Sequence, residues 1–118
     1  MDSILDSVKK LLGIEVDYTH FDADIILHIN TVFVILCQMG VGPEKPFIIN
    51  DNQTIWKDFF GDKEDNMVKS YIFMKVKMAF DPPISGLVKE ITEQQISEFE
   101  WRLNVAHDTI KLEENHEP

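Results

Sequence analysis

Apolar residues recur at helical spacing through most of this 118-residue chain, in segments that end at glycine or proline. Gly13, Gly40 and the Pro82-Pro83 pair stand where three of these segments should stop. The pattern predicts helices over residues 2–12, 22–39, 66–80 and 85–112, and one or two helical turns over 54–60. We therefore predict an all-α fold, a small bundle of about four to five helices with a long C-terminal helix.

Short polar side chains at the start of several segments are predicted to cap the helices. Asp2 or Ser3 precedes the first segment, Asp22 opens the second and Thr54 precedes the short one. Between residues 40 and 52, two prolines and an extended-looking stretch around Ile48 predict a loop or a short strand.

The segment 22–39 is apolar on nearly all sides, which is typical of a helix buried on several faces, and we expect it to be the central helix. Asn30 falls within its apolar arc. A buried asparagine can provide a specific contact to a partner, or its amide can bond to a neighbouring backbone segment. We favour the backbone bond.

The composition favours one folded domain, residues 1–112, followed by an acidic tail, residues 113–118. The net charge of -10 disfavours binding to nucleic-acid phosphates but suits the wall of a passage through which DNA slides. Cys37 is the single cysteine, so the chain has neither an intramolecular disulfide nor a cysteine-built zinc site. Without a visible signal peptide or membrane span, we expect a soluble protein.

No pattern in the sequence predicts catalysis or metal binding. The four histidines are scattered, and His28 shares a helix face with Asp24 alone, which is more typical of an ordinary surface pair than of a metal site. Residues 62–65 lack the spaced ligands and central glycine of a calcium loop, and we interpret the acidic clusters near Asp22 and Asp62 as caps and solvated turns. We expect no cofactor, no metal and no enzymatic activity.

The last predicted helix has apolar residues on two opposite faces. One stripe should dock on the bundle, and it comprises Val88, Ile91, Ile96, Phe99, Leu103, Ala106 and Ile110. The opposite side carries a sparser row, comprising Leu87, Gln94, Trp101, Val105 and Leu112. A monomer has little use for this second row.

Trp101 is the most informative member of the second row, because tryptophan is common at contact hot spots. It contacts a partner protein in one interpretation and packs under the loop Phe47–Ile49 in the other. Arg102 beside it can pair with Glu98 one helical turn earlier. The candidate partner-contact residues are Leu87, Trp101, Arg102, Val105 and Leu112.

The order of short motifs resembles that of small head-to-tail connector proteins, also called head completion or adaptor proteins, of long-tailed bacteriophages. A leading helix ends in Leu-Gly-Ile, and the next helix ends in a Gly-Val-Gly turn that contains Gly40 and Gly42. The remaining motifs are Thr54-Ile55-Trp56, the Val-Lys-Ser-Tyr-Ile stretch of residues 68–72, Phe80-Asp81-Pro82-Pro83, and the Glu-Trp-Arg-Leu-Asn stretch of residues 100–104. Together they span residues 3–104.

This resemblance implies a structural virion protein in the neck, between head and tail. Connectors of the family form a twelve-fold ring on the portal protein, extend the DNA channel and offer a platform to a stopper or tail-completion protein. Genomic DNA passes through the ring without specific binding, no membrane is involved, and assembly takes place in the host cytoplasm. The C-terminal helix commonly reaches the portal.

Two alternatives remain open from the residues alone. The chain can be a small helical regulatory or adaptor protein that binds one partner around Trp101 without forming a ring. It can also be an enzyme with an unrecognised site, which would require His28 or His107 to meet carboxylates in a pocket.

Overall fold

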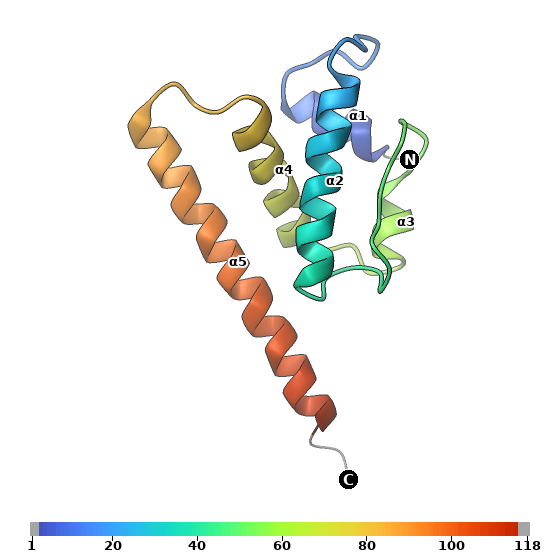
Figure 1. Cartoon of the computed structure of the whole chain (residues 1–118), viewed down its shortest axis with the longest axis vertical. Helices are drawn as coiled ribbons and strands as arrows, with labels where there is room; N and C mark the ends of the chain where they lie inside the picture. Colours follow the sequence, from blue (N-terminus) through green and yellow to red (C-terminus); the bar gives the residue numbers. More distant parts are fainter. Residues whose placement is uncertain (1–2, 116–118) are drawn as a thin grey trace.

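The computed structural model describes residues 3–115, with side chains described as far as Ala106. Its helices are α1 (Ile4–Leu11), α2 (Asp22–Gln38), α3 (Trp56–Phe60), α4 (Asn66–Phe80) and α5 (Gly86–Asn115). Within the described residues, the β structure consists of one isolated antiparallel bridge between Ser3 and Ile55. The predicted fold class, a small all-α bundle with a long C-terminal helix, is confirmed (Figure 1).

Helix α4 is the central element, because α2 packs along one side of it and α5 packs along another (Figure 1). Tyr71, Ile72 and Val76 of α4 are fully buried in the common core. The prediction that residues 22–39 form the central helix was therefore wrong. Leu27 and Val34 of α2 are exposed, because α2 lies at the edge of the bundle.

A buried lysine joins α1 to the start of α2. The Lys9 side chain is 1% exposed, and its ammonium donates to the carbonyl oxygens of Val16 and Tyr18, each at 2.8 Å. Asp22 lies 2.8 Å from the same nitrogen and forms an ion pair with it. Two hydrogen bonds to carbonyl oxygens and the opposite charge of Asp22 together make burial of the ammonium tolerable.

Side chains cap α1 and α4, the first of them at Ser3 as predicted. Ser3 Oγ accepts the Asp6 N–H at 3.2 Å to begin α1, and Asp65 Oδ1 accepts the Met67 N–H at 2.9 Å to begin α4. Asp22 does not cap α2: Phe21 is the N-cap residue and makes no side-chain bond, whereas the Asp22 carboxylate binds Lys9. The capping prediction for Asp22 was wrong because its long-range partner is not visible in the local pattern.

Thr54 does not cap α3 either. Ile55 is the N-cap residue, and its N–H donates to the Asp58 carboxylate at 3.0 Å. The Thr54 carbonyl instead accepts the Ile4 N–H at 3.0 Å, next to the Ser3–Ile55 bridge. The segment before α3 is therefore fastened to the start of α1.

Asn30 binds backbone, as favoured from the sequence. Its amide nitrogen donates to the Ile49 carbonyl at 2.9 Å, and its Oδ1 accepts the Ile49 N–H at 2.8 Å. This pair of bonds holds the loop of residues 40–55 against α2 and buries the Ile49 side chain in the core. The loop contains no assigned strand among the described residues.

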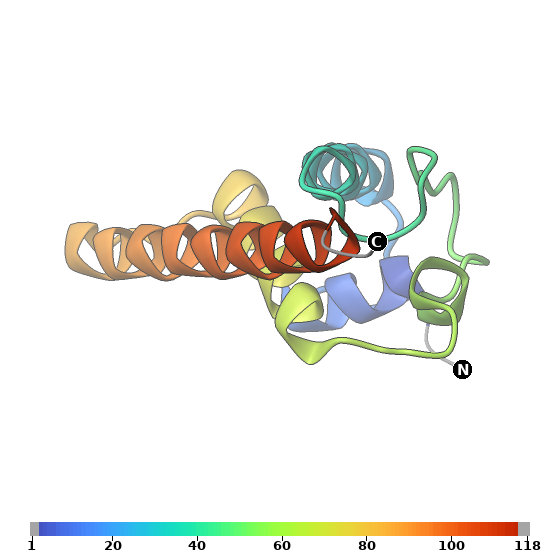
Figure 2. The same cartoon turned by 90° about the horizontal axis from the view of Figure 1, so that it is seen from below.

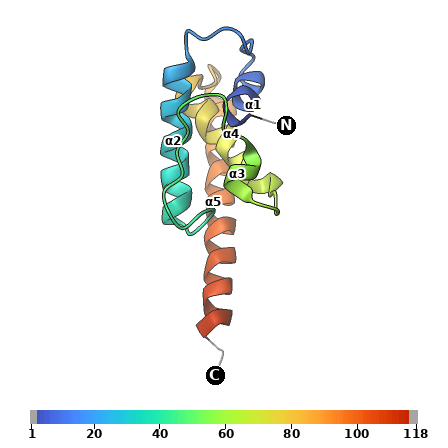
Figure 3. The same cartoon turned by 90° about the vertical axis from the view of Figure 1, so that its right-hand side faces the viewer.

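Helix α5 leaves the bundle at both ends. It begins one residue later than predicted and its backbone continues to Asn115, past the predicted end at Leu112. Its first turns project sideways from the other helices, and its C-terminal turns extend beyond the end of α2 (Figures 2 and 3). Only the middle of α5 is therefore in a position to pack against α4.

Substitution of Lys9 by methionine should destabilise the fold, because the Asp22 carboxylate would lose its ion-pair partner and two carbonyl oxygens would lose their donor. We expect a loss of about 2–3 kcal/mol in the free energy of unfolding. Urea titration followed by circular dichroism measures it. Lys10→Met is the matched control, since Lys10 is exposed and should change stability by less than about 0.5 kcal/mol. Equal effects of the two substitutions would contradict a central role for Lys9.

Candidate interaction surface

The inner face of α5 is fixed to α4 by apolar packing and one partly buried hydrogen bond. Ile96 and Leu103 are buried and Phe99 is half-buried against the core. The hydroxyl of Tyr71 donates to Glu100 Oε2 at 2.8 Å, and Lys75 lies 3.8 Å from the same oxygen. These contacts set the rotation of α5 about its axis, and so decide which residues it presents outward.

The Tyr71–Glu100 bond keeps its donor over a wide pH range. Burial of the phenol, then its hydrogen bond to Glu100 and the charge of that carboxylate, raise the pKa of Tyr71 well above its usual range. The hydroxyl therefore remains protonated, and it donates to Glu100 wherever the protein is folded near neutral pH.

Part of the predicted docking stripe of α5 does not dock. Val88 and Ile91, near the first turns, and Ala106, near the end of the described side chains, are exposed. The reason is geometric: α5 diverges from α4, so residues outside its middle turns reach no neighbour in the chain. Ile110 lies outside the described side chains.

The outward face of α5 carries a continuous row, which we call the outer seam. It comprises Leu87, Ile91, Gln94, Glu98, Trp101 and Val105, all of them exposed. Successive members are separated alternately by four and three residues, which keeps them on one face of a helix. Leu87 is 68% exposed and Trp101 is 66% exposed, a large apolar area for a face without a partner.

The predicted contact residues that the structure describes all lie on or beside the outer seam. Leu87, Trp101 and Val105 belong to it, and the guanidinium of exposed Arg102 pairs with Glu98 at 2.6 Å. Trp101 does not pack under Phe47–Ile49, because Asn30 holds that loop against α2 on the far side of the bundle. Leu112 lies outside the described side chains.

A groove of about 570 Å³ runs beside the seam, and the sequence did not predict it. Leu11 of α1, Phe73 and Met74 of α4, and Phe99 of α5 contribute its apolar lining. Glu98, a member of the outer seam, and Arg102 beside it also line the groove. The local sequence does not distinguish Leu11 from the buried residues of α1. Its exposure depends instead on the distance between α1 and α5.

Two glycines of the Gly-Val-Gly turn adopt backbone conformations that other residues rarely take. Gly40, directly after the C-cap of α2, has φ of 78°, and Gly42 has φ of 92°. A Cβ atom on Gly42 would lie 2.7 Å from the Phe59 ring, which is closer than packed carbon atoms approach. The turn therefore needs glycine at residue 42 for both backbone and packing reasons.

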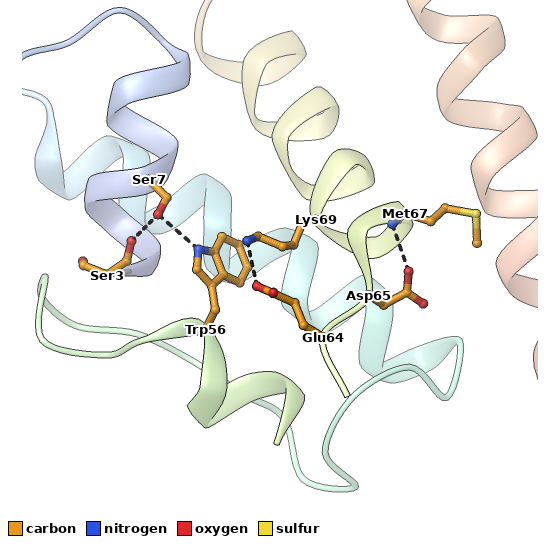
Figure 4. A network of polar contacts seen from close by, with 7 residues as sticks. All are labelled: Ser3, Ser7, Trp56, Glu64, Asp65, Met67 and Lys69. Atoms are coloured by element: carbon orange, nitrogen blue, oxygen red, sulfur yellow. Dashed lines mark hydrogen bonds and ion pairs between the residues drawn. The ribbon is translucent and has the colours of Figure 1, made fainter. Parts of the chain in front are cut away.

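Trp56 links three helices through its indole ring (Figure 4). Its N–H donates to Ser7 Oγ at 3.1 Å, and Ser7 Oγ donates in turn to the Ser3 carbonyl at 2.7 Å. The ammonium of Lys69 lies 5.0 Å from the centre of the ring, held by an ion pair with Glu64 at 2.8 Å. The Trp56 side chain is buried, and its contacts join α1, α3 and α4.

The Asp81-Pro82-Pro83 motif ends α4. Asp81 is the C-cap residue, and its carboxylate pairs with Lys77 at 2.7 Å across one turn. The prolines that follow prevent a further helical turn and start the connection to α5. This break sets the point at which α5 diverges from α4.

The described side chains contain no group of three or more histidine, cysteine or acidic residues that could hold a metal ion. His28 packs edge-on against the Phe80 ring, with ring centres 6.4 Å apart, and makes no ion pair with a described carboxylate. His107 lies outside the described side chains. Among the described helices, none combines the length and the apolar character needed to cross a membrane.

An exposed row of apolar side chains on one helix face is a common feature of proteins that bind other proteins. Comparison with known families is consistent with that class: the family model described as "Phage connector protein" matches residues 4–109. The chain belongs to the phage connector protein family, and connectors are structural components of the phage particle. No curated protein and no solved structure matches the chain.

Replacement of Tyr71 by phenylalanine should loosen the attachment of α5 to α4, because Glu100 would lose its buried donor. We expect a loss of about 1 kcal/mol in the free energy of unfolding, measured by urea titration. Lys75→Met removes only the longer, partly exposed ion pair to Glu100 and should cost at most about 0.5 kcal/mol. A larger effect for Lys75→Met would show that the ion pair, not the hydrogen bond, fastens α5.

Proposed function

We propose that this connector forms a ring on the portal vertex of a phage head. The ring extends the DNA channel beyond the portal and provides the docking platform for neck or tail proteins. The observation that carries the proposal is the outer seam on a chain of the connector family: apolar side chains that the bundle leaves uncovered need another protein to cover them.

The outer seam is the proposed contact with the portal or with a neighbouring copy in the ring. Exposed Trp101 lies near its C-terminal end, with Arg102 and the apolar groove beside it. Tryptophan and arginine are both enriched at contact hot spots. Copies of one chain can close into a ring when two different faces of each subunit meet.

The charge of the chain supports the channel role. With 21 acidic and 11 basic residues, the surface repels phosphate groups on average. A ring built from such subunits would let genomic DNA pass without holding it. The proposed location is the virion neck, reached after assembly in the host cytoplasm, with a stopper or tail-completion protein bound below the ring.

Electron microscopy of phage that lack this gene tests the proposal. We expect packaged heads and separate, finished tails, and joined particles only when a copy of the gene is supplied. Infectious particles formed without the gene would contradict the connector role. A stable one-to-one complex with a single protein, together with normal particles, would instead support the regulatory alternative.

Replacement of Trp101 by alanine should leave the fold intact and weaken assembly, because the side chain is exposed and lies away from the core. Loss of a contact hot spot of about 2 kcal/mol lowers affinity roughly 30-fold. We expect the yield of complemented infectious particles to fall at least about tenfold. Circular dichroism should show unchanged helix content.

Ile48→Ala is the matched control for this substitution, since Ile48 is another exposed apolar residue but lies in the loop on the far side of the bundle from α5. Its particle yield should stay close to that of the unsubstituted protein. A loss of helix content in Trp101→Ala, or equal losses of yield in both variants, would contradict a contact role for Trp101.

A further inference from the structure

The outer seam has a symmetry of its own, apart from any role in the ring. Read from its two ends toward its centre, it pairs Leu87 with Val105, Ile91 with Trp101, and Gln94 with Glu98. Apolar residues are thus matched with apolar residues, and a polar amide is matched with a carboxylate. A row with this order is complementary to itself when one copy runs in the opposite direction.

The spacing of the seam is also that of a coiled coil. Its alternating steps of four and three residues are those of the two apolar positions of a heptad repeat. In an antiparallel pair, a residue at one of these positions meets a residue at the other position of the partner helix. Each of the three matches above combines the two positions in that way.

Charge decides between the two directions of pairing. A parallel pair would place Glu98 against Glu98 of the second copy, and two carboxylates would repel each other in the centre of the seam. An antiparallel pair places Glu98 opposite Gln94, whose amide can donate to it. The antiparallel pairing therefore gives Gln94 and Glu98 a hydrogen-bond partner and covers the four apolar residues of the seam.

The residues that flank the seam allow the same arrangement. Gln95 and Ser97, next to its centre, would each face their own counterpart, and neither is charged. Towards the ends, Glu90 would face Asn104, and Arg102 would lie beside apolar Val88. No like charges meet along the pair. The buried face, with Ile96 and Leu103, points away from the seam, so the two bundles would lie on opposite sides.

We propose that the free protein pairs with a second copy of itself through an antiparallel contact between the outer seams of two α5 helices. The contact is isologous, so it closes at two copies and does not extend into a ring. The proposal rests on the outer seam alone. The contact would cover the apolar surface that is exposed on a single subunit. The seam spans about 27 Å at the rise of an α-helix, so we expect a reversible pair with a dissociation constant on the order of micromolar.

Sedimentation velocity of the full chain, over concentrations from about 1 to several hundred micromolar, tests the pairing. We expect the mass to rise from the 13.7 kDa monomer to twice that value. In the antiparallel pair, Gln94→Glu would place a second carboxylate opposite Glu98 of the other copy. This repulsion would occur at both ends of the central pair and should weaken the dimer about tenfold. Gln94→Lys would place opposite charges there and should strengthen it by a similar factor.

A parallel pair would respond differently, because residue 94 would then face itself. Both Gln94→Glu and Gln94→Lys would weaken such a pair, and that outcome would overturn the proposal. Matched controls are Gln53→Glu and Gln53→Lys, since Gln53 is exposed in the loop before α3 and should leave the dissociation constant unchanged. A mass that stays at that of the monomer, or that exceeds that of two copies, would also overturn the proposal.

Disulfide trapping checks the direction independently, in a Cys37→Ser background that removes the native thiol. Leu87→Cys and Val105→Cys proteins should form a linked dimer when mixed, and neither should do so alone, since like residues lie about 27 Å apart in the antiparallel pair. A linked dimer of Leu87→Cys alone would indicate the parallel pair and overturn the proposal. Neither measurement requires a phage, so its outcome is separate from the test of the connector role.

Discussion

The ammonium group of Lys9 is the interaction on which the N-terminal half of the bundle depends. A buried positive charge is tolerated only where acceptors surround it, and here two carbonyls and Asp22 provide them. These acceptors come from the connection between α1 and α2 and from the first turn of α2, so one side chain orders three successive parts of the chain. Asp22 is also favourably placed at the positive end of the α2 dipole. With α1 held in this way, Ser7 is in position to accept the indole N–H of Trp56 and so to locate α3.

Local signals in the sequence predicted the elements that local interactions define. Helix α4 runs over the predicted residues 66–80 because Asp65 caps its start and the prolines after Asp81 stop it, and both signals lie within one turn of the helix ends. The roles of Lys9 and Asp22 could not be predicted in the same way. Their partners lie several residues away along the chain, and a lysine between apolar residues has the same pattern whether it is buried or exposed.

The helical periodicity of the sequence predicted part of the candidate surface. The sequence placed Leu87, Trp101 and Val105 opposite the docking stripe, and these residues are exposed. It assigned Ile91 to the docking stripe, although the structure places that residue on the outer seam. Helical spacing gives the direction of a side chain around its own axis, but not the distance to the next helix. That distance depends on how α5 diverges from α4 after Asp81-Pro82-Pro83, which no single segment encodes.

Pairing of free subunits and contact with a portal would compete for the same seam. If both occur, each subunit must leave its pair before the seam is available, so the net affinity for the portal is lowered by the free energy of pairing. The cost is small when pairing is micromolar, and the benefit is that Leu87 and Trp101 stay covered at high protein concentration during assembly. A self-complementary seam with Gln94 and Glu98 at its centre suits this balance, because polar residues in the middle of an apolar contact specify its direction while limiting its strength.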